Sequence, residues 1–456
     1  MSSVRRALSS LLPAAIALVA VVVLAPSEAA ATPFYSVGSA HACNTCHVEP
    51  TGWHNPQTYR NRRCTLDCQG CHYSPTGGGL RTPLGRFYAA EELAMWGARP
   101  SSWADPDRFL REGEPNEGRY LLGRGGFSGW WPGEVQHREI PDRYGRFDAD
   151  PTWAVGGDFR WLGIVPTDGD PDREFVGFPM ELQAYVAANP LPNLTAYLDL
   201  GYQGSRNRGI GGSQPVGDTV WYTDLLWIRE VFVMVHDLPY SSYVRAGRFN
   251  LPYGWRISDH TAYIRQGLFD QYRQAYGVEV GFAPNEYWGN LALWYQGIDD
   301  WPGERGMFPQ AFGATAQGGV RYLGYTLGGS LHAMNGEEGS LDEFMVGPMW
   351  GINYHPIVYL GELDYRRENI DGLPGTNQLR LYHELQVQQV TGFTPKLRFE
   401  WEDRDMDIVD DHRSRLAVGA EWNPLAQLQM DALWRQELLP EGTGASELLI
   451  QLHAHW

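Results

Sequence analysis

From about Asp150 to the C-terminus, apolar and polar residues alternate in segments that Gly, Pro, Asn and Asp clusters separate. Successive side chains of a β-strand point to opposite faces, so such a segment has one apolar and one polar face. In the stretch 194–203, five apolar residues share one face, and the other face carries Thr195, Asp199 and Gln203. The pattern predicts a large antiparallel β-protein.

The polar rows of these segments carry many charges. Near the C-terminus, Leu397 and Phe399 alternate with Arg398 and Glu400. Apolar rows that end in Trp or Tyr suit a lipid-facing band, and charged rows suit a water-filled interior. About sixteen such segments lie between Trp153 and Trp456. We therefore expect an all-β fold, a transmembrane antiparallel β-barrel of about sixteen strands.

The last segment and the connections support this expectation. In Leu448–Trp456 every second residue is apolar, which resembles the terminal strand of outer-membrane barrel proteins. The short stretches Tyr322–Tyr325 and Asn423–Pro424 are expected to be periplasmic turns, and the polar stretches 205–218 and 297–310 to be outer loops. The alternative is a soluble β-protein such as an eight-bladed propeller, because antiparallel sheets in water also alternate. A propeller would show a repeat of about forty residues, and we find none.

The first 31 residues have the pattern of an export signal. Arg5 and Arg6 precede a largely apolar run over 11–24, and small residues precede Thr32, where we expect cleavage. The run is short for a membrane anchor, which is the alternative. The formal charge of the chain is −18, which argues against nucleic acid as a partner and is compatible with a cationic metal or protein partner.

One short motif, Cys-x-x-Cys-His, occurs twice before the barrel. The copies are Cys43-Asn-Thr-Cys46-His47 and Cys68-Gln-Gly-Cys71-His72. This is the pattern of c-type haem attachment, in which both cysteines bind the porphyrin and the histidine is the proximal iron ligand. A zinc site is the main alternative, but zinc sites more often pair Cys-x-x-Cys units without a fixed following histidine. We therefore expect two haem c groups.

The distal iron ligands are less constrained. His54 is the preferred candidate because it lies between the two motifs, and His41 and Met95 are the other nearby candidates. Three histidines on the expected interior face of the barrel are further candidates: His332, His453 and His455. For each of these three, a polar wall residue is the simpler interpretation. Cys64 is not spaced for a third motif, and we assign it no role.

The chain therefore divides into four parts. Residues 1–31 are the expected signal peptide, 32–96 a diheme c-type cytochrome segment, 97–150 a Gly/Pro-rich connector or plug, and 151–456 the barrel. The haem segment is too short to build a core of its own, so the two porphyrins would supply most of its apolar mass. Its glycines after the second motif would let the backbone lie close to a porphyrin face.

This arrangement resembles a known family. A signal, an aromatic-Gly stretch before the first Cys-x-x-Cys-His, the element Pro83–Phe87 and a porin-like barrel are similar to the fused outer-membrane porin–cytochromes. These include iron-oxidising outer-membrane cytochromes and extracellular electron-transfer conduits. The stretch 246–254 also looks like porin-type strand-and-turn sequence. The iron-oxidising members typically carry one haem, whereas this chain has two motifs.

The resemblance and the motifs together imply electron transfer across the bacterial outer membrane through two haem c groups. The haem segment would lie in the barrel lumen or on the periplasmic side. Expected partners are outer-membrane lipid and a periplasmic or extracellular redox partner, either a cytochrome or a metal. The alternatives are a surface oxidoreductase, for example for Fe(II), and a diffusion porin with a haem-based gate or sensor. We expect an electron-transfer protein rather than a turnover enzyme.

Overall fold

The structure is a computed structural model of the 456-residue chain. It describes residues 72–81, 153–169, 173–191, 193–202, 226–257, 259, 261–265, 274–283, 287–296, 310–322, 325–336, 341–354, 356–387, 392–425 and 427–455.

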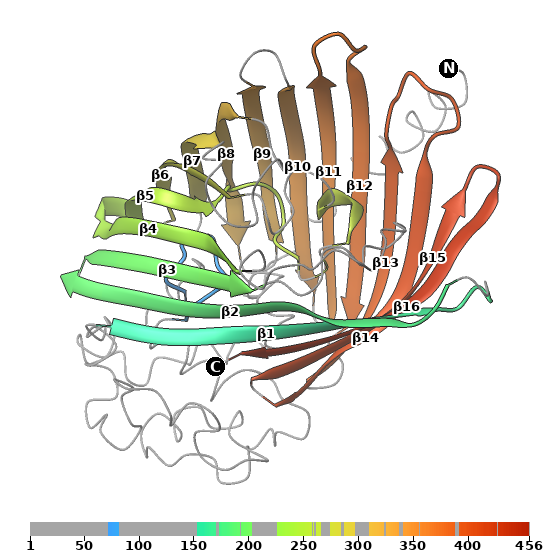
Figure 1. Ribbon diagram of the computed structural model, residues 1–456, viewed down its shortest axis with the longest axis horizontal. Helices are drawn as coiled ribbons and strands as arrows, with labels where there is room; N and C mark the ends of the chain where they lie inside the picture. The colour runs from blue at the N-terminus through green and yellow to red at the C-terminus, as the bar shows by residue number, and fades with distance from the viewer. Residues whose placement is uncertain are drawn as a thin grey trace.

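The described residues form sixteen β-strands that close into one antiparallel barrel (Figure 1). The strands are β1 (Trp153–Pro166), β2 (Val176–Leu191), β3 (Leu194–Tyr202), β4 (Leu226–Leu238), β5 (Ser242–Asn250), β6 (Gln274–Phe282), β7 (Tyr287–Gln296), β8 (Ala311–Tyr322), β9 (Tyr325–Gly336), β10 (Asp342–Tyr354), β11 (Ile357–Asn369), β12 (Thr376–Val387), β13 (Phe393–Asp403), β14 (Arg413–Leu425), β15 (Leu428–Leu439) and β16 (Gly442–His455). Each strand pairs with its neighbours in the sequence, and β1 pairs with β16 to close the cylinder. The expected antiparallel barrel of about sixteen strands is confirmed, and the single closed barrel of the described residues excludes a propeller there.

The connections differ at the two ends of the barrel. From even-numbered to odd-numbered strands they are short, as between β8 and β9 or between β10 and β11. At the opposite end they include the long stretches 203–225, 251–273 and 297–310. Strand β1 begins and β16 ends at the short-turn end.

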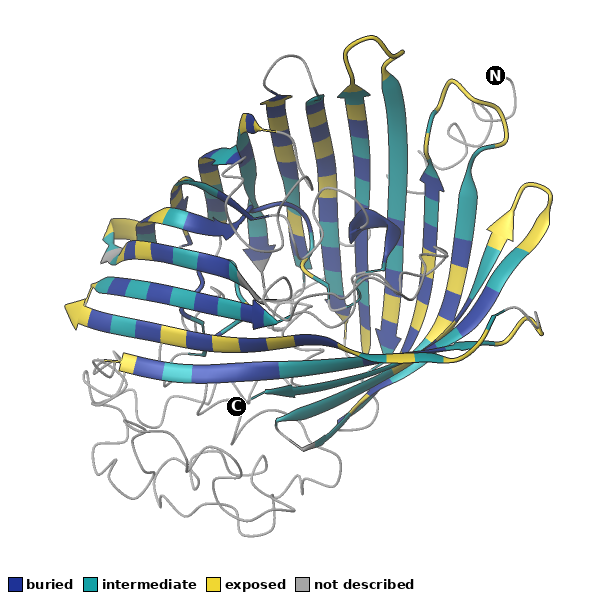
Figure 2. Ribbon diagram, in the orientation of Figure 1, coloured by how far each residue is buried: buried dark blue, intermediate teal, exposed yellow. Residues whose placement is uncertain are grey.

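Burial alternates along the strands in the inverse sense of a water-soluble protein, as the banding in Figure 2 shows. On β6 and β7 the outward Val280 and Leu293 are 51% and 61% exposed. The inward Glu279 and Ala292 are fully buried. Since a continuous apolar outer face and a polar inner face suit lipid outside and a polar lumen inside, the barrel has the surface of a membrane protein.

Exposed aromatic side chains gather near the short-turn end of the barrel. The members are Trp153, Tyr240, Phe282, Tyr287, Tyr354 and Trp422. Membrane barrels carry such aromatic girdles at the level of the lipid headgroups. The aromatic ends that the sequence pattern predicted are therefore confirmed for this rim.

The turn predictions are confirmed in one case and wrong in the other. Strands β8 and β9 end and begin at Tyr322 and Tyr325, as expected. Asn423 and Pro424 instead lie inside β14, and the strand continues to Leu425. The pairing of β14 with β15 shifts register between Trp422 and Leu425, so the proline is accommodated at an irregularity and does not end the strand.

Two short 3-10 helices occur among the described residues, Pro239–Ser241 and Tyr263–Arg265. No helix in the described part of the chain is long and apolar enough to cross a membrane.

Candidate functional site

The ten residues that start at His72 form a small hairpin inside the barrel (blue in Figure 1). His72 and Arg81 form an antiparallel bridge, and the Tyr73 N–H donates to the Leu80 carbonyl at 3.0 Å. Tyr73 and Leu80 are 3% and 2% exposed and pack with inward side chains of the barrel wall in one apolar cluster. The second Cys-x-x-Cys-His motif therefore runs directly into a segment that is buried in the lumen.

Three successive glycines make the turn of this hairpin. Gly77, Gly78 and Gly79 have φ angles of 82°, 75° and 62°, which L side chains rarely adopt. At Gly79 a Cβ atom would collide with the hydroxyl of Tyr197 on β3. The close approach that the sequence indicated is, at Gly79, an approach to the barrel wall.

Hydrogen bonds from the wall hold the hairpin in place. The Leu80 N–H donates to the Tyr197 hydroxyl at 3.3 Å, and Asn189 on β2 donates to the Tyr73 hydroxyl at 3.3 Å. Arg256, from the chain after β5, donates to the Thr76 hydroxyl at 3.0 Å. The hairpin is thus fixed to the wall on one side and to a lumenal segment on the other.

The imidazole of His72 is suited to bind a metal. Burial, together with the positive charges of Arg81 and Arg256, lowers the pKa of His72 to about 3. The ring is therefore neutral at physiological pH, and a neutral imidazole has the lone pair that an iron ligand needs. These properties fit the proximal ligand of a c-type haem, the role that the motif predicts for His72.

Two further histidines reach the lumen from the last strand. His453 and His455 of β16 stand beside Arg160 and Asp158 of β1, and their rings are 5.5 Å apart. The Asp158 carboxylate accepts a hydrogen bond from Tyr185 at 2.7 Å. We call His72, His453, His455 and Asp158 the histidine face. His455 lies within electrostatic range of His72, so the hairpin and the end of β16 share one side of the lumen.

A second segment, 251–265, crosses the lumen from β5 to the opposite wall. The Tyr253 hydroxyl donates to Asp364 on β11 at 3.0 Å. The Trp255 N–H donates to Glu362 of the same strand at 2.6 Å, and the Tyr263 N–H donates to Glu400 on β13 at 2.8 Å. This segment is therefore tied to strands far from β5 in the sequence.

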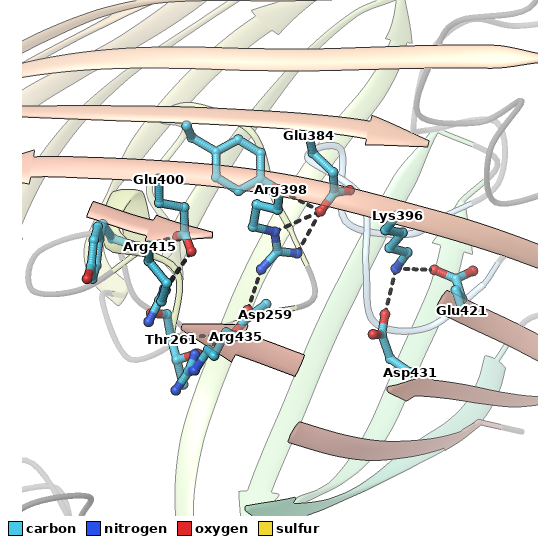
Figure 3. Close-up of polar contacts among 12 residues, drawn as sticks. Asp259, Thr261, Glu384, Lys396, Arg398, Glu400, Arg415, Glu421, Asp431 and Arg435 are labelled. Atoms are coloured by element: carbon cyan, nitrogen blue, oxygen red, sulfur yellow. Dashed lines mark hydrogen bonds and ion pairs between the residues drawn. The ribbon is translucent and has the colours of Figure 1, made fainter. Parts of the chain in front are cut away.

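Where this segment meets β12 to β15, charges pair in a compact group (Figure 3). Arg398 lies between Asp259 and Glu384, at 2.5 Å and 2.7 Å. Arg415 binds Glu400 at 2.7 Å. Arg435 donates to the Thr261 hydroxyl. We call this group the ion-pair cluster: Asp259, Thr261, Glu384, Arg398, Glu400, Arg415 and Arg435.

The cluster favours the charged form of Asp259. Burial opposes ionisation of this carboxyl, but the guanidinium groups of Arg398, Arg435 and Arg415 outweigh it and hold the pKa of Asp259 well below its usual range. Asp259 also accepts hydrogen bonds from the Thr261 N–H and hydroxyl, at 2.8 Å and 2.6 Å. The segment is thus locked to the wall by buried, paired charges.

Most residues that the sequence predicted for haem binding lie outside the described part of the chain. They are His41, Cys43, Cys46, His47, His54, Cys68, Cys71 and Met95. Among the described residues, no group of three or more His, Cys, Asp and Glu side chains is arranged to hold a metal ion by itself. His72 is described and is lumenal. His332 is a wall residue, stacked on Trp294 at 5.4 Å and bonded to Thr315 at 2.9 Å.

The sequence analysis missed the lumen-crossing segment. The stretch 246–254 was expected to be strand and turn, and β5 does end at Asn250. The following residues turn inward at Gly254, whose φ angle is 58°. That glycine and the neighbouring Pro252 were the local signal of a turn, but nothing local indicates that Asp259 pairs with Arg398 across the barrel.

No protein family and no curated protein matches the chain. Among solved structures, the barrel is similar to a loop L8 deletion mutant of OmpT, an outer membrane protein of Vibrio cholerae. That match has a TM-score of 0.50 and 8% identity, and it covers 67% of this chain and 99% of OmpT. OprB of Pseudomonas putida matches with a TM-score of 0.50 and 7% identity, covering 67% of this chain and 94% of OprB. The likeness shows the fold, a β-barrel of the outer-membrane type.

Proposed function

We propose that this protein transfers electrons across the bacterial outer membrane through two covalently attached haem c groups, the second of them held in the barrel lumen. The observation that carries the proposal is the burial of the hairpin that starts at His72 against the inner wall. Because the Cys-x-x-Cys-His motif is directly continuous with this buried hairpin, a haem attached to the motif would be held at the lumen of the membrane barrel.

The residues around the hairpin have separate tasks in this proposal. Tyr197 and Asn189 fix the hairpin to the wall, and Arg256 fixes it to the lumen-crossing segment. The imidazole of His72 is buried and neutral, so it has a lone pair available to bind iron. When bound, haem c supplies reversible one-electron chemistry, one electron accepted and one passed on.

The surface of the barrel supports the proposed location. Its apolar outer face requires lipid, and the aromatic rim at the short-turn end suits the headgroup level. The haem segment precedes β1, which begins at that end. With short turns on the periplasmic side, as in other outer-membrane barrels, the first motif would meet a periplasmic redox partner. The acceptor or donor outside would be a second cytochrome or a metal.

Haem loading is the first test. The Cys68→Ser/Cys71→Ser variant is expected to lose one of two covalent haems, by haem staining and by the mass of the intact chain. Cys64→Ser is the matched control, because Cys64 is the cysteine outside both motifs. It is expected to keep both haems. Equal haem content in the two variants would contradict the proposal.

Electron transfer is the second test. A redox dye is sealed inside proteoliposomes that contain the full-length protein, and a membrane-impermeant reductant is added outside. Wild type and Cys64→Ser are expected to reduce the dye, and Cys68→Ser/Cys71→Ser to lose most of that rate. If fully haem-loaded wild-type protein leaves the dye oxidised, the conduit function is wrong.

One observation favours a diffusion channel as the second candidate. Segment 251–265 crosses the lumen and presents paired charges there, an arrangement that would restrict and select solutes. The same proteoliposomes distinguish the two functions: swelling in small sugars without dye reduction would favour the channel.

A further inference from the structure

The two lumenal histidines of β16 are two residues apart on the same face, yet their surroundings differ. The ring of His453 has one hydrogen bond and one ion-pair contact, although its Nε2 atom makes no hydrogen bond. Its Nδ1 atom lies 3.3 Å from the Gln429 side-chain oxygen, and its Nε2 atom lies 3.4 Å from the Asp158 carboxylate. His453 is thus a wall residue with a clear structural role.

His455 has no such role. Both of its ring nitrogens are buried without a hydrogen-bond partner. A buried polar atom without a partner is costly, and native proteins seldom keep one without a functional reason. The ring is also adjacent to His453, and to Asp158 through strand pairing, so it projects into the lumen.

The neighbourhood of His455 points to its partner. The groups that act on it electrostatically are Arg81 and His72 of the hairpin, with His453 and Asp158 of the wall. Asp158 is occupied by Tyr185 and faces His453. His72, by contrast, is the histidine of the second Cys-x-x-Cys-His motif. Two imidazoles therefore lie on one side of the lumen, the motif histidine on the hairpin and the unpartnered His455 on the wall.

A c-type haem attached through Cys68 and Cys71 has one axial position for the histidine of its motif and a second position that another side chain can fill. We propose that His455 is the distal ligand of this second haem, so that the last strand of the barrel closes the iron site that His72 begins. The inference rests on the proposed function. It replaces His54, His41 and Met95 as distal ligands for this haem alone.

The assignment also gives the hairpin's attachment a purpose. The hydrogen bonds of Tyr197 and Asn189 hold the hairpin beside the wall. A ligand from β16 then joins the haem segment to the strand that closes the barrel. Loading with haem would therefore complete the fold as well as the redox site.

The test compares His455→Ala with His453→Ala in the purified, haem-loaded full-length protein, by optical and EPR spectra. In His455→Ala one of the two haems is expected to change from six-coordinate low-spin to high-spin iron, and added imidazole is expected to restore the low-spin signal. His453→Ala removes the same ring from the same face and is expected to keep both haems low-spin. An unchanged spectrum in His455→Ala would overturn the inference.

A second variant guards against failed assembly. His455→Met keeps a side chain that can bind iron, and thioether ligation raises the haem potential. One of the two midpoint potentials is expected to rise, and an unchanged pair of potentials would overturn the assignment. The outcomes also separate the two proposals. Absence of covalent haem in wild type contradicts the proposed function, whereas two haems with spectra indifferent to residue 455 contradict this inference alone.

Discussion

The ion-pair cluster and the histidine face satisfy their polar groups to different degrees. In the ion-pair cluster, the guanidinium groups of Arg398, Arg415 and Arg435 all find carboxylate or hydroxyl partners. On the histidine face, the buried ring nitrogens of His455 have none. The same barrel therefore contains one cluster whose buried charges are paired and one whose buried imidazole nitrogens lack hydrogen-bond partners.

This difference distinguishes polar residues that hold the fold together from polar residues that are suited to bind a ligand. Buried charges that are fully paired hold an element in place, and breaking such a pair is costly. Buried polar atoms without partners weaken the fold unless something else binds them. The ion-pair cluster therefore explains how the lumen-crossing segment is held, and the histidine face is where a cofactor would complete the structure.

The largest effect is expected in the ion-pair cluster. Arg398→Ala leaves Asp259 and Glu384 buried without their shared cation, and should lower the free energy of unfolding by about 3–5 kcal/mol. Arg404→Ala is the control, since Arg404 is 57% exposed and its pair with Glu402 should contribute under about 1 kcal/mol. Denaturant unfolding of the barrel in lipid vesicles measures both. If both variants lost the same free energy of unfolding, the distinction between buried and exposed ion pairs would be contradicted.

The next effect depends on pH. In Asp259→Asn the lost charge should reduce the free energy of unfolding by about 1.5–3 kcal/mol at pH 7. The pKa of Asp259 is lowered in the fold, so its contribution is complete above the unfolded value near 3.9 and fades as the pH falls below it. The difference between wild type and variant should thus be constant from neutral pH to about pH 5 and shrink towards about pH 2. If the difference in free energy of unfolding between wild type and Asp259→Asn instead grew as the pH fell, the predicted direction of the pH dependence would be wrong.

A smaller effect is expected at the hairpin. Gly79→Ala combines a positive φ angle with a collision against Tyr197, and should destabilise the docked hairpin by about 1–3 kcal/mol. Gly169 is the matched control, because its φ angle is 77° and no atom lies within 4 Å of its added Cβ. Trypsin cleavage after Arg81 reports hairpin release. Cleavage should be faster than in wild type for Gly79→Ala and unchanged for Gly169→Ala. Faster cleavage in Gly169→Ala than in Gly79→Ala would show that the hairpin is not docked at Tyr197.

The smallest effect is expected on the histidine face itself. In the Cys68→Ser/Cys71→Ser background, which is expected to lack the second haem, His455→Leu should change the free energy of unfolding by under about 1 kcal/mol or stabilise the barrel, since it removes unpartnered polar atoms. Thr261→Val in the same background should cost more, because the Thr261 hydroxyl donates to Asp259. A large loss in His455→Leu would give His455 a structural role and remove the contrast between the two sides.

The barrel could be predicted from the sequence because its signal is local. Each strand of a membrane barrel carries its own period-two pattern, as in β13, where Leu397 is exposed and Arg398 is buried. Strand number followed from counting such segments. The turn at Asn423 was misplaced because a proline normally interrupts a strand, whereas here a register shift accommodates it.

The sites were only partly predictable. The motif identified His72, and the alternation placed His455 on the lumenal face. Neither pattern could show that the two histidines share one side of the lumen, because their proximity depends on the closure of the barrel through β1 and β16. The lumen-crossing segment was missed for the same reason, since Asp259 and Arg398 are 139 positions apart in the sequence.

The central claim is that the second haem lies inside the barrel. A cryo-EM map of the haem-loaded protein in a lipid nanodisc tests it most directly. We predict planar density continuous with His72, within the cylinder and bordered by β1, β2, β3 and β16. Density for that porphyrin outside the cylinder, beyond the short-turn end, would contradict the account.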